Sequence, residues 1–234
     1  LKNKVARVPL SLTVAGFSAI CCLAHGTLLY LGENLPMSSS WNYYNMILVQ
    51  KVNYIRWIEY SFSSGLMLVN IAALAQIRGY YDLLNIFIGT SITNYFGLWT
   101  ELAEKSFKPY PFALGFVPFM IPWFQIFSKI NDTSSYFDRE IKPLIEYKNN
   151  GKEFAVDIPL IFKVTTFSLF AIYFGFPGNM YLQYWVYGKE DGYYKGEKNY
   201  LILSAFSKSF LSWMIFAGTL REDEDYLGTD KEPD

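Results

Sequence analysis

The sequence predicts an all-α protein that crosses a membrane several times. Apolar residues make up 52% of the 234 residues, and they are concentrated in long blocks instead of recurring with the spacing of amphipathic helices. Several blocks are long enough to cross the hydrocarbon core of a bilayer as one helix. Lys and Arg number 20 and Asp and Glu 21, so the charge balance gives no electrostatic support for binding nucleic acid. We therefore expect a multi-pass membrane protein in contact with lipid.

Six segments are expected to cross the membrane as helices, namely residues 9–31, 54–77, 82–101, 111–129, 158–187 and 198–220. The fifth is longer than the roughly 20 residues that a perpendicular span needs. It should tilt, protrude or break at FGFPGN, where Pro177 lacks a backbone donor. The longest polar loop begins at Asn131 and leads to this segment. Residues 1–220 would form the bundle, and residues 221–234 a mobile acidic tail without apolar residues to bury.

Ionisable side chains inside such segments are rare and costly, so they mark candidate functional positions. Lys208 is the only charged residue in the last segment beyond its first position, and it would lie near mid-depth. Glu59 lies in RWIEYSFSSGLM of the second segment, with Arg56 three residues earlier on the same helical face. His25 is the sole histidine, and it acts either as a hydrogen-bonded packing residue or as a proton relay. Lys163 lies near a segment end and is expected to extend its amine toward the interface.

Lys208 and Glu59 are compatible with two roles. A buried ion pair could simply fix the register of two helices. Alternatively, a lysine in apolar surroundings loses its proton readily and condenses with an aldehyde as a Schiff base, and the protonated Schiff base would need a nearby carboxylate. Hydroxyl groups that could satisfy the remaining hydrogen bonds belong to Ser204, one turn from Lys208, and to Ser61, Ser63 and Ser64 after Glu59.

Aromatic residues in the fourth and fifth segments could line a slot for a flat polyene. These residues are Trp123, Tyr173, Phe174 and Phe176. No spacing of cysteines or histidines predicts a metal site.

Two motifs together resemble the heliorhodopsins, which are retinal proteins of inverted topology relative to other microbial rhodopsins. They are RWIEYSFSSGLM in the second segment and LILSAFSKSFLSWMIFAGTL in the last. FVPFMIPWFQIF and MYLQYW are also similar to stretches of the family, so the resemblance extends from residue 9 onward. It implies a rhodopsin-like seven-helix bundle, a retinal chromophore, a homodimer in the membrane and no enzymatic activity.

By this resemblance Lys208 carries all-trans retinal as a Schiff base, Glu59 is the counterion, and Ser204 hydrogen-bonds near the linkage. His25 would belong to a polar cavity beside the Schiff base, where it and Glu59 are candidates for relaying protons. The pocket would be lined by Tyr60, Ser63, Ser64, Met67, Trp123, Tyr173 and Phe174. The run FGFPGN departs from the family pattern beside the last two of these residues.

The chain also departs from the family in its number of helices. The first segment matches the second helix of the family, which predicts that the first helix precedes Leu1. Alternatively, this segment is the first helix and the second is lost, which would change the assignment of His25.

The orientation in the membrane is predicted differently by charge and by resemblance. Lys and Arg outside the segments are more frequent on the side of the N-terminus, the long loop and the tail, which by the positive-inside rule would be cytoplasmic. The family instead places the N-terminus of the full-length protein in the cytoplasm and the C-terminus outside. We follow the resemblance because the rule discounts long loops. Asn131, in the acceptor motif NDT for N-glycosylation, would then be extracellular.

Two functions agree with the resemblance: a light sensor that signals to a partner, and a light-gated proton conductor. In both, retinal isomerisation changes the proton affinity of the Schiff base and then the packing of the helices. Family members generally have slow photocycles without pumping, whereas some viral members carry light-gated proton currents. The further acids Asp82, Glu101, Glu104 and Asp157 lie near segment ends, and none is clearly at mid-membrane. A third alternative is a small non-rhodopsin transporter, or a lipid enzyme, with a buried Glu and Lys.

Overall fold

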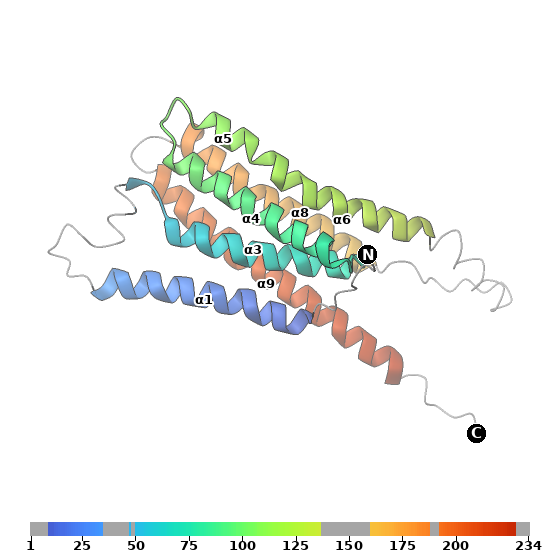
Figure 1. Ribbon diagram of the computed structural model, residues 1–234. Helices are drawn as coiled ribbons and strands as arrows, with labels where there is room; N and C mark the ends of the chain where they lie inside the picture. The colour runs from blue at the N-terminus through green and yellow to red at the C-terminus, as the bar shows by residue number, and fades with distance from the viewer. Residues whose placement is uncertain (1–8, 35–46, 48–49, 137–159, 188–191, 228–234) are drawn as a thin grey trace, which may run out of the picture. The chain divides into compact units, whose positions relative to one another are not determined.

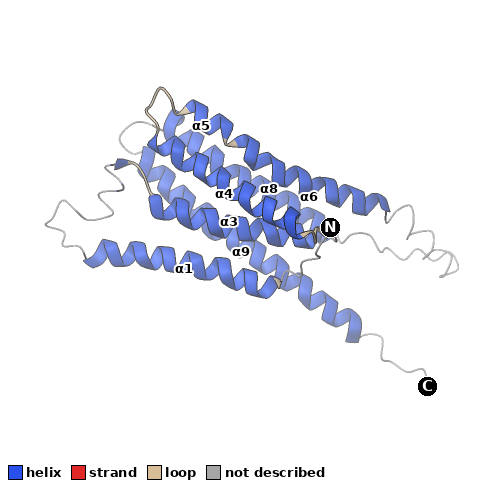
Figure 2. Ribbon diagram, viewed as in Figure 1, coloured by secondary structure: helices blue, strands red, loops and turns tan. Residues whose placement is uncertain are grey.

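The computed structural model describes residues 9–34, 47, 50–136, 160–187 and 192–227. Helices account for most of these residues, and Figure 2 shows no strand among them. The chain divides into two compact units, Leu1–Thr166 and Phe167–Asp234, which we describe one at a time.

The first unit is an assembly of neighbouring helices (Figure 1). Its helices are α1 (Leu10–Asn34), α3 (Tyr54–Leu74), α4 (Tyr80–Leu102), α5 (Pro109–Leu114) and α6 (Phe116–Tyr136). Helix α3 packs against α1 and α4, and α4 also packs against α5 and α6. A Cβ atom on Gly65 would lie 2.7 Å from the ring of Phe87, so glycine is what allows α3 and α4 to approach closely here.

Local signals set the ends of α3 and α4. The side chain of Asn53 accepts a hydrogen bond of 3.1 Å from the Arg56 amide and so caps the start of α3. After α3, Gln76 has a φ of 64°, a left-handed conformation that turns the chain toward α4. Asp82 lies in the first turn of α4, where a carboxylate is favoured by the partial positive charge of the helix start.

The second unit contains most of α8 (Leu160–Tyr181), a π-helix (Leu182–Val186) and α9 (Gly192–Leu227). The rings of Phe176 and Tyr200 stack between α8 and α9 with centroids 6.2 Å apart. Next to them, the Asn179 amide donates to the Gly196 carbonyl at 2.9 Å, and Asn199 donates to Asn179 at 3.0 Å. These polar contacts fix the register of α9 against α8, because each buried amide must find a partner.

Each of the six expected segments is helical over most of its described residues, so the prediction that these segments form helices is confirmed. Within the described residues, three segments are long and apolar enough to cross a membrane: Leu10–Tyr30, Pro109–Asp132 and Gly192–Ala217. Helices α3, α4 and α8 remain predicted spans.

The expected end of the fourth segment was wrong. The segment consists of α5 and α6, which meet at Gly115, and α6 continues to Tyr136. Asn131 and Asp132 are therefore helical and exposed instead of lying in a loop. A helix satisfies its own backbone hydrogen bonds, so polar residues can extend it beyond the apolar stretch. The rest of the predicted loop, residues 137–159, lies outside the described part of the chain.

Of the three alternatives for the fifth segment, only a break at Pro177 is excluded, because α8 runs through this residue to Tyr181 and then changes to π-helical hydrogen bonding. Tilting and protrusion remain predictions. The loss of one backbone donor is tolerated in a helix whose neighbouring hydrogen bonds remain. Helix α9 continues to Leu227, so the first part of the expected acidic tail is helical, while residues 228–234 are outside the described part.

Candidate functional site

The second unit places a buried amine on α9. Lys208 is only 9% exposed, and its Nζ donates a hydrogen bond of 2.6 Å to the Ser204 hydroxyl one turn earlier. Ser207 donates to the Ser204 carbonyl at 3.1 Å, and Ser212 donates to the Lys208 carbonyl at 2.8 Å. The expectation that Ser204 and Lys208 share a helical face is confirmed. The hydroxyl gives the amine a polar partner within residues 199–220, which carry no other charge.

Neighbouring aromatic residues of α8 differ in burial. Tyr173 is buried, and its ring lies edge-on to Phe176 with centroids 6.2 Å apart. Phe174 is 41% exposed and packs edge-on against Phe170. Consecutive helical residues point about 100° apart, so Tyr173 faces the interior while Phe174 faces largely outward. Tyr173 is therefore the better placed of the two to line an internal pocket.

In the first unit, Glu59 is a buried carboxylate of α3 that is 3% exposed. His25 is on α1, the helix that packs against α3. The Nδ1 atom of His25 lies 2.8 Å from the Cys21 carbonyl oxygen. A carbonyl can only accept, so Nδ1 carries the hydrogen of this bond and Nε2 is the nitrogen that can take up a further proton.

The serines that follow Glu59 differ in what they can contact. Ser61 and Ser64 donate to backbone carbonyls of their own helix, those of Trp57 and Tyr60, at 2.8 and 2.5 Å. Both of these hydroxyls use their hydrogen within α3, and the role of the serines around Glu59 stays a prediction. Ser63 lies one turn from Glu59 and is fully buried, and its Oγ has no hydrogen-bond partner within the described residues.

The remaining expected lining residues of the first unit are almost completely buried. Tyr60 lies edge-on to Trp57, and Met67 lies two turns beyond Glu59 on the same helix. Trp123 of α6 stacks on Phe127 with ring centroids 5.9 Å apart. These side chains belong to the buried core of the first unit, and their role as pocket lining stays a prediction.

Sequence reasoning missed a buried ion pair between α3 and α4. Arg56, expected on the face of Glu59, is paired with Glu101, and the two side chains are 6% and 0% exposed. Glu101 also accepts hydrogen bonds from Trp57 Nε1 at 2.7 Å and from the backbone N–H of Asn53 at 3.2 Å. The only sequence signal was the position of Glu101 at the end of an apolar segment, because its partner lies 45 residues away.

Lys108 extends the polar cluster just outside α4. Its Nζ donates to the carbonyls of Thr100 and Glu101, both at 2.7 Å. These carbonyls belong to the last turn of α4, where cations are favoured by the partial negative charge of the helix end. Burial lowers the pKa of Lys108, and the negative charge of Glu101 partly opposes this shift.

The fold and the site define a class: a helical membrane protein with a buried, hydrogen-bonded lysine on its last helix and a buried carboxylate on an earlier one. The sequence profile of the heliorhodopsins matches residues 1–220. The chain belongs to the heliorhodopsin family. It is therefore an integral membrane protein of the rhodopsin type, a photoreceptor whose chromophore is retinal. The comparison with individually curated proteins finds no match.

The residues present fit retinal in their chemistry. Lys208 offers a buried amine, the group that reacts with an aldehyde. Met67 and Trp123 of the first unit and, separately, Tyr173 of the second unit are buried side chains of the kind that contacts a long apolar chain. The hydroxyl of Ser63 and the carboxylate of Glu59 offer polar groups for a positive charge in an otherwise apolar environment.

Proposed function

We propose that Lys208 is the attachment point of all-trans retinal, held as a Schiff base, and that Glu59 is its counterion in a light sensor. The observation that carries this proposal is the buried Lys208 amine with its hydrogen bond of 2.6 Å to Ser204. When bound, retinal supplies the absorption of visible light and the isomerisation that follows it. The chain supplies the amine, the compensating charge and a binding site that excludes water.

Glu59 and Ser204 have complementary roles in this proposal. A positive charge in a low-dielectric interior is stable only if a negative charge compensates it. Glu59 is a buried carboxylate that can supply the negative charge, whereas the neutral hydroxyl oxygen of Ser204 accepts a hydrogen bond from the Lys208 nitrogen. Light would alter the electrostatic field around the Lys208 nitrogen. This change would shift protons among the nearby ionisable groups and then alter the packing of the helices.

His25 is proposed as the proton relay partner of Glu59. Its Nδ1–H is held by the Cys21 carbonyl, which fixes the orientation of the ring on α1. Glu59 is a buried carboxylate of α3, the helix that packs against α1, and in this proposal it exchanges a proton with the imidazole. A relay of this kind needs no metal ion.

Light-gated proton conduction is the second candidate function, and buried polar atoms of α3 favour it. Asn70 is fully buried like Ser63, and its Nδ2 also has no hydrogen-bond partner among the described residues. Its Oδ1 accepts from Thr13 of α1 at 2.5 Å. Polar groups of this kind can hold water along a proton path. Whole-cell photocurrents at two external pH values distinguish the functions, because a conductor gives a current that reverses with the proton gradient.

We further propose, from the family resemblance, that the protein is a homodimer with an extracellular C-terminus. Exposed apolar residues such as Leu12 and Leu23 on α1 suit either lipid or a second copy. Cross-linking in native membranes tests the dimer.

The test of the attachment point is Lys208→Ala, with Lys195→Ala as the matched control on the exposed surface of the same helix. After addition of all-trans retinal, the wild-type chain and the control should develop a visible absorption band, and Lys208→Ala should not. Size-exclusion chromatography should show the same amount of folded protein for all three. Normal pigment formation in Lys208→Ala would refute the assignment.

A further inference from the structure

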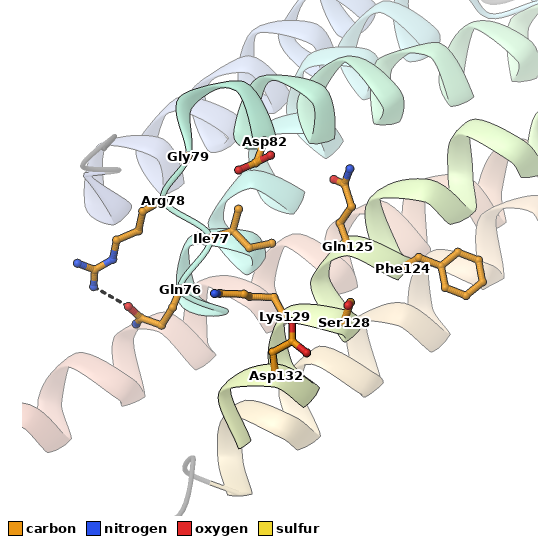
Figure 3. Close-up of a pocket in the computed structure, with 10 residues that line it drawn as sticks. All are labelled: Gln76, Ile77, Arg78, Gly79, Asp82, Phe124, Gln125, Ser128, Lys129 and Asp132. Atoms are coloured by element: carbon orange, nitrogen blue, oxygen red, sulfur yellow. Dashed lines mark hydrogen bonds between the residues drawn. The ribbon is translucent and has the colours of Figure 1, made fainter. Parts of the chain in front are cut away.

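A cavity of about 640 Å³ lies where the turn between α3 and α4 faces the last turns of α6 (Figure 3). Its volume is in the range of small-molecule binding sites. None of the residues proposed for retinal lines it. The cavity is therefore a separate site, and its occupant has to be inferred from its own chemistry.

The cavity contains two charges of each sign. Arg78 and Lys129 are the cations, and Asp82 and Asp132 are the acids. Figure 3 shows Lys129 extending from α6 toward the turn at Gln76. The guanidinium of Arg78 also donates to Gln76 Oε1 at 2.6 Å. A lining that carries charges of both signs is complementary to a zwitterion, whose two ends each meet an opposite charge.

A buried acceptor adds a more specific requirement. The Oε1 atom of Gln125 is buried without a hydrogen-bond partner within the described residues. Gln125 and Asp82 come from facing helices and border the same part of the cavity (Figure 3). An amide oxygen and a carboxylate both accept hydrogen bonds, so together they favour a group with N–H donors, such as a primary ammonium.

Features around the cavity are typical of residues at the depth of lipid head groups. The apolar segment that contains α6 ends at Asp132, so the cavity borders the end of a membrane-crossing stretch. Tyr80 and Tyr81 at the start of α4 are exposed and pack edge-on with ring centroids 5.6 Å apart. Exposed tyrosines are typical of the membrane–water interface. Phe124, on the cavity wall, is exposed as well and offers a surface for an acyl chain.

We propose that this cavity binds the head group of a phospholipid that carries a primary amine, of the phosphatidylethanolamine class. Arg78 and Lys129 bind the phosphate, while Asp82, Asp132 and the Gln125 carbonyl oxygen bind the ammonium. A choline head group cannot donate N–H hydrogen bonds, and a glycerol head group has no cation to pair with the acids. The site therefore prefers ethanolamine lipids to both, and this preference does not depend on retinal or on the proposed photochemistry.

The preference can be measured by native mass spectrometry of the full chain. The protein is released from nanodiscs that contain equal amounts of phosphatidylethanolamine, phosphatidylcholine and phosphatidylglycerol. We expect one phosphatidylethanolamine to be retained per chain. Lys129→Gln should reduce its retention about tenfold, as expected for the loss of one charge-assisted hydrogen bond. Lys195→Gln, which removes an exposed lysine far along the sequence, should not change it.

A second variant tests the recognition of the amine and covers the case in which Lys129→Gln fails to fold. Gln125→Leu should retain phosphatidylethanolamine and phosphatidylcholine to similar extents, because it removes the neutral acceptor and leaves the four charged residues in place. Equal retention of all three lipids by the wild-type chain would overturn the proposal. Displacement of the lipid by soluble phosphoethanolamine at the same concentration would also overturn it, because the ligand would then be a soluble zwitterion.

Discussion

Neutralising Glu101 should destabilise the protein strongly, because this carboxylate compensates the buried charge of Arg56. Glu101→Gln is the most informative substitution. Glutamine keeps the shape of glutamate and an oxygen that can accept from Trp57 Nε1 and the Asn53 amide, which are 2.7 and 3.2 Å from Glu101 in the wild type. The substitution therefore removes mainly the negative charge opposite the guanidinium.

The magnitude follows from the burial of the pair. The side chains of Arg56 and Glu101 are 6% and 0% exposed, so water cannot solvate the guanidinium once its partner is neutral. Breaking a pair buried to this extent costs about 3–5 kcal/mol of unfolding free energy. Stacking of the guanidinium on the Trp57 ring, with Cζ 4.7 Å from the centroid, remains and offsets only a small part of the cost.

A double-mutant cycle in mixed detergent micelles measures the coupling. We expect Glu101→Gln and Arg56→Met to be destabilising individually, and the double variant to lose less than the sum because no charge is left uncompensated. Lys105→Gln, which alters an exposed lysine just after α4, should change the unfolding free energy by less than about 0.5 kcal/mol. A cost below about 1 kcal/mol for Glu101→Gln, or strictly additive effects, would refute the idea that the pair compensates a buried charge.

Three other predictions concern the counterion, the helix end and the topology. Glu59→Gln should move the titration of the visible band to lower pH, because the protonated Schiff base loses its proton more easily beside a neutral amide than beside a carboxylate. An unchanged titration, both in chloride and in a bulky anion that does not bind, would exclude Glu59 as the counterion. Burial lowers the pKa of Lys108 below its ordinary value of 10.5. At pH values just below 10.5 the unfolded chain therefore binds more protons than the folded chain, so the free energy of unfolding should rise with pH in this range. Lys108→Met should remove this contribution from the pH profile of unfolding, and an identical profile would contradict the shift. Asn131 is exposed near the end of α6, and it should be glycosylated in a eukaryotic host if that end is extracellular. If a cysteine at this position is labelled only from the cytoplasmic side, the proposed orientation is wrong.

Much of the helical framework and of the chemistry on α9 could be predicted from the sequence. Long apolar segments form helices in a membrane because the backbone must satisfy its own hydrogen bonds, and all six segments are helical over most of their described residues. Ser204 and Lys208 are four residues apart, so helical geometry alone predicts that they share a face, and the hydrogen bond of 2.6 Å joins them. Motifs of this local kind also carried the resemblance to the family that the profile match confirmed.

Helix ends and long-range partners were decided by the tertiary structure. Helix α6 continues to Tyr136 and α9 to Leu227 because polar residues are accepted in a helix once it leaves the apolar region. Arg56 pairs with Glu101 because α3 and α4 pack side by side, and no local spacing encodes the approach of two residues that are 45 positions apart. A residue's spacing along its own helix determines its face, whereas the packing of the neighbouring helices determines which charge or hydroxyl it meets there.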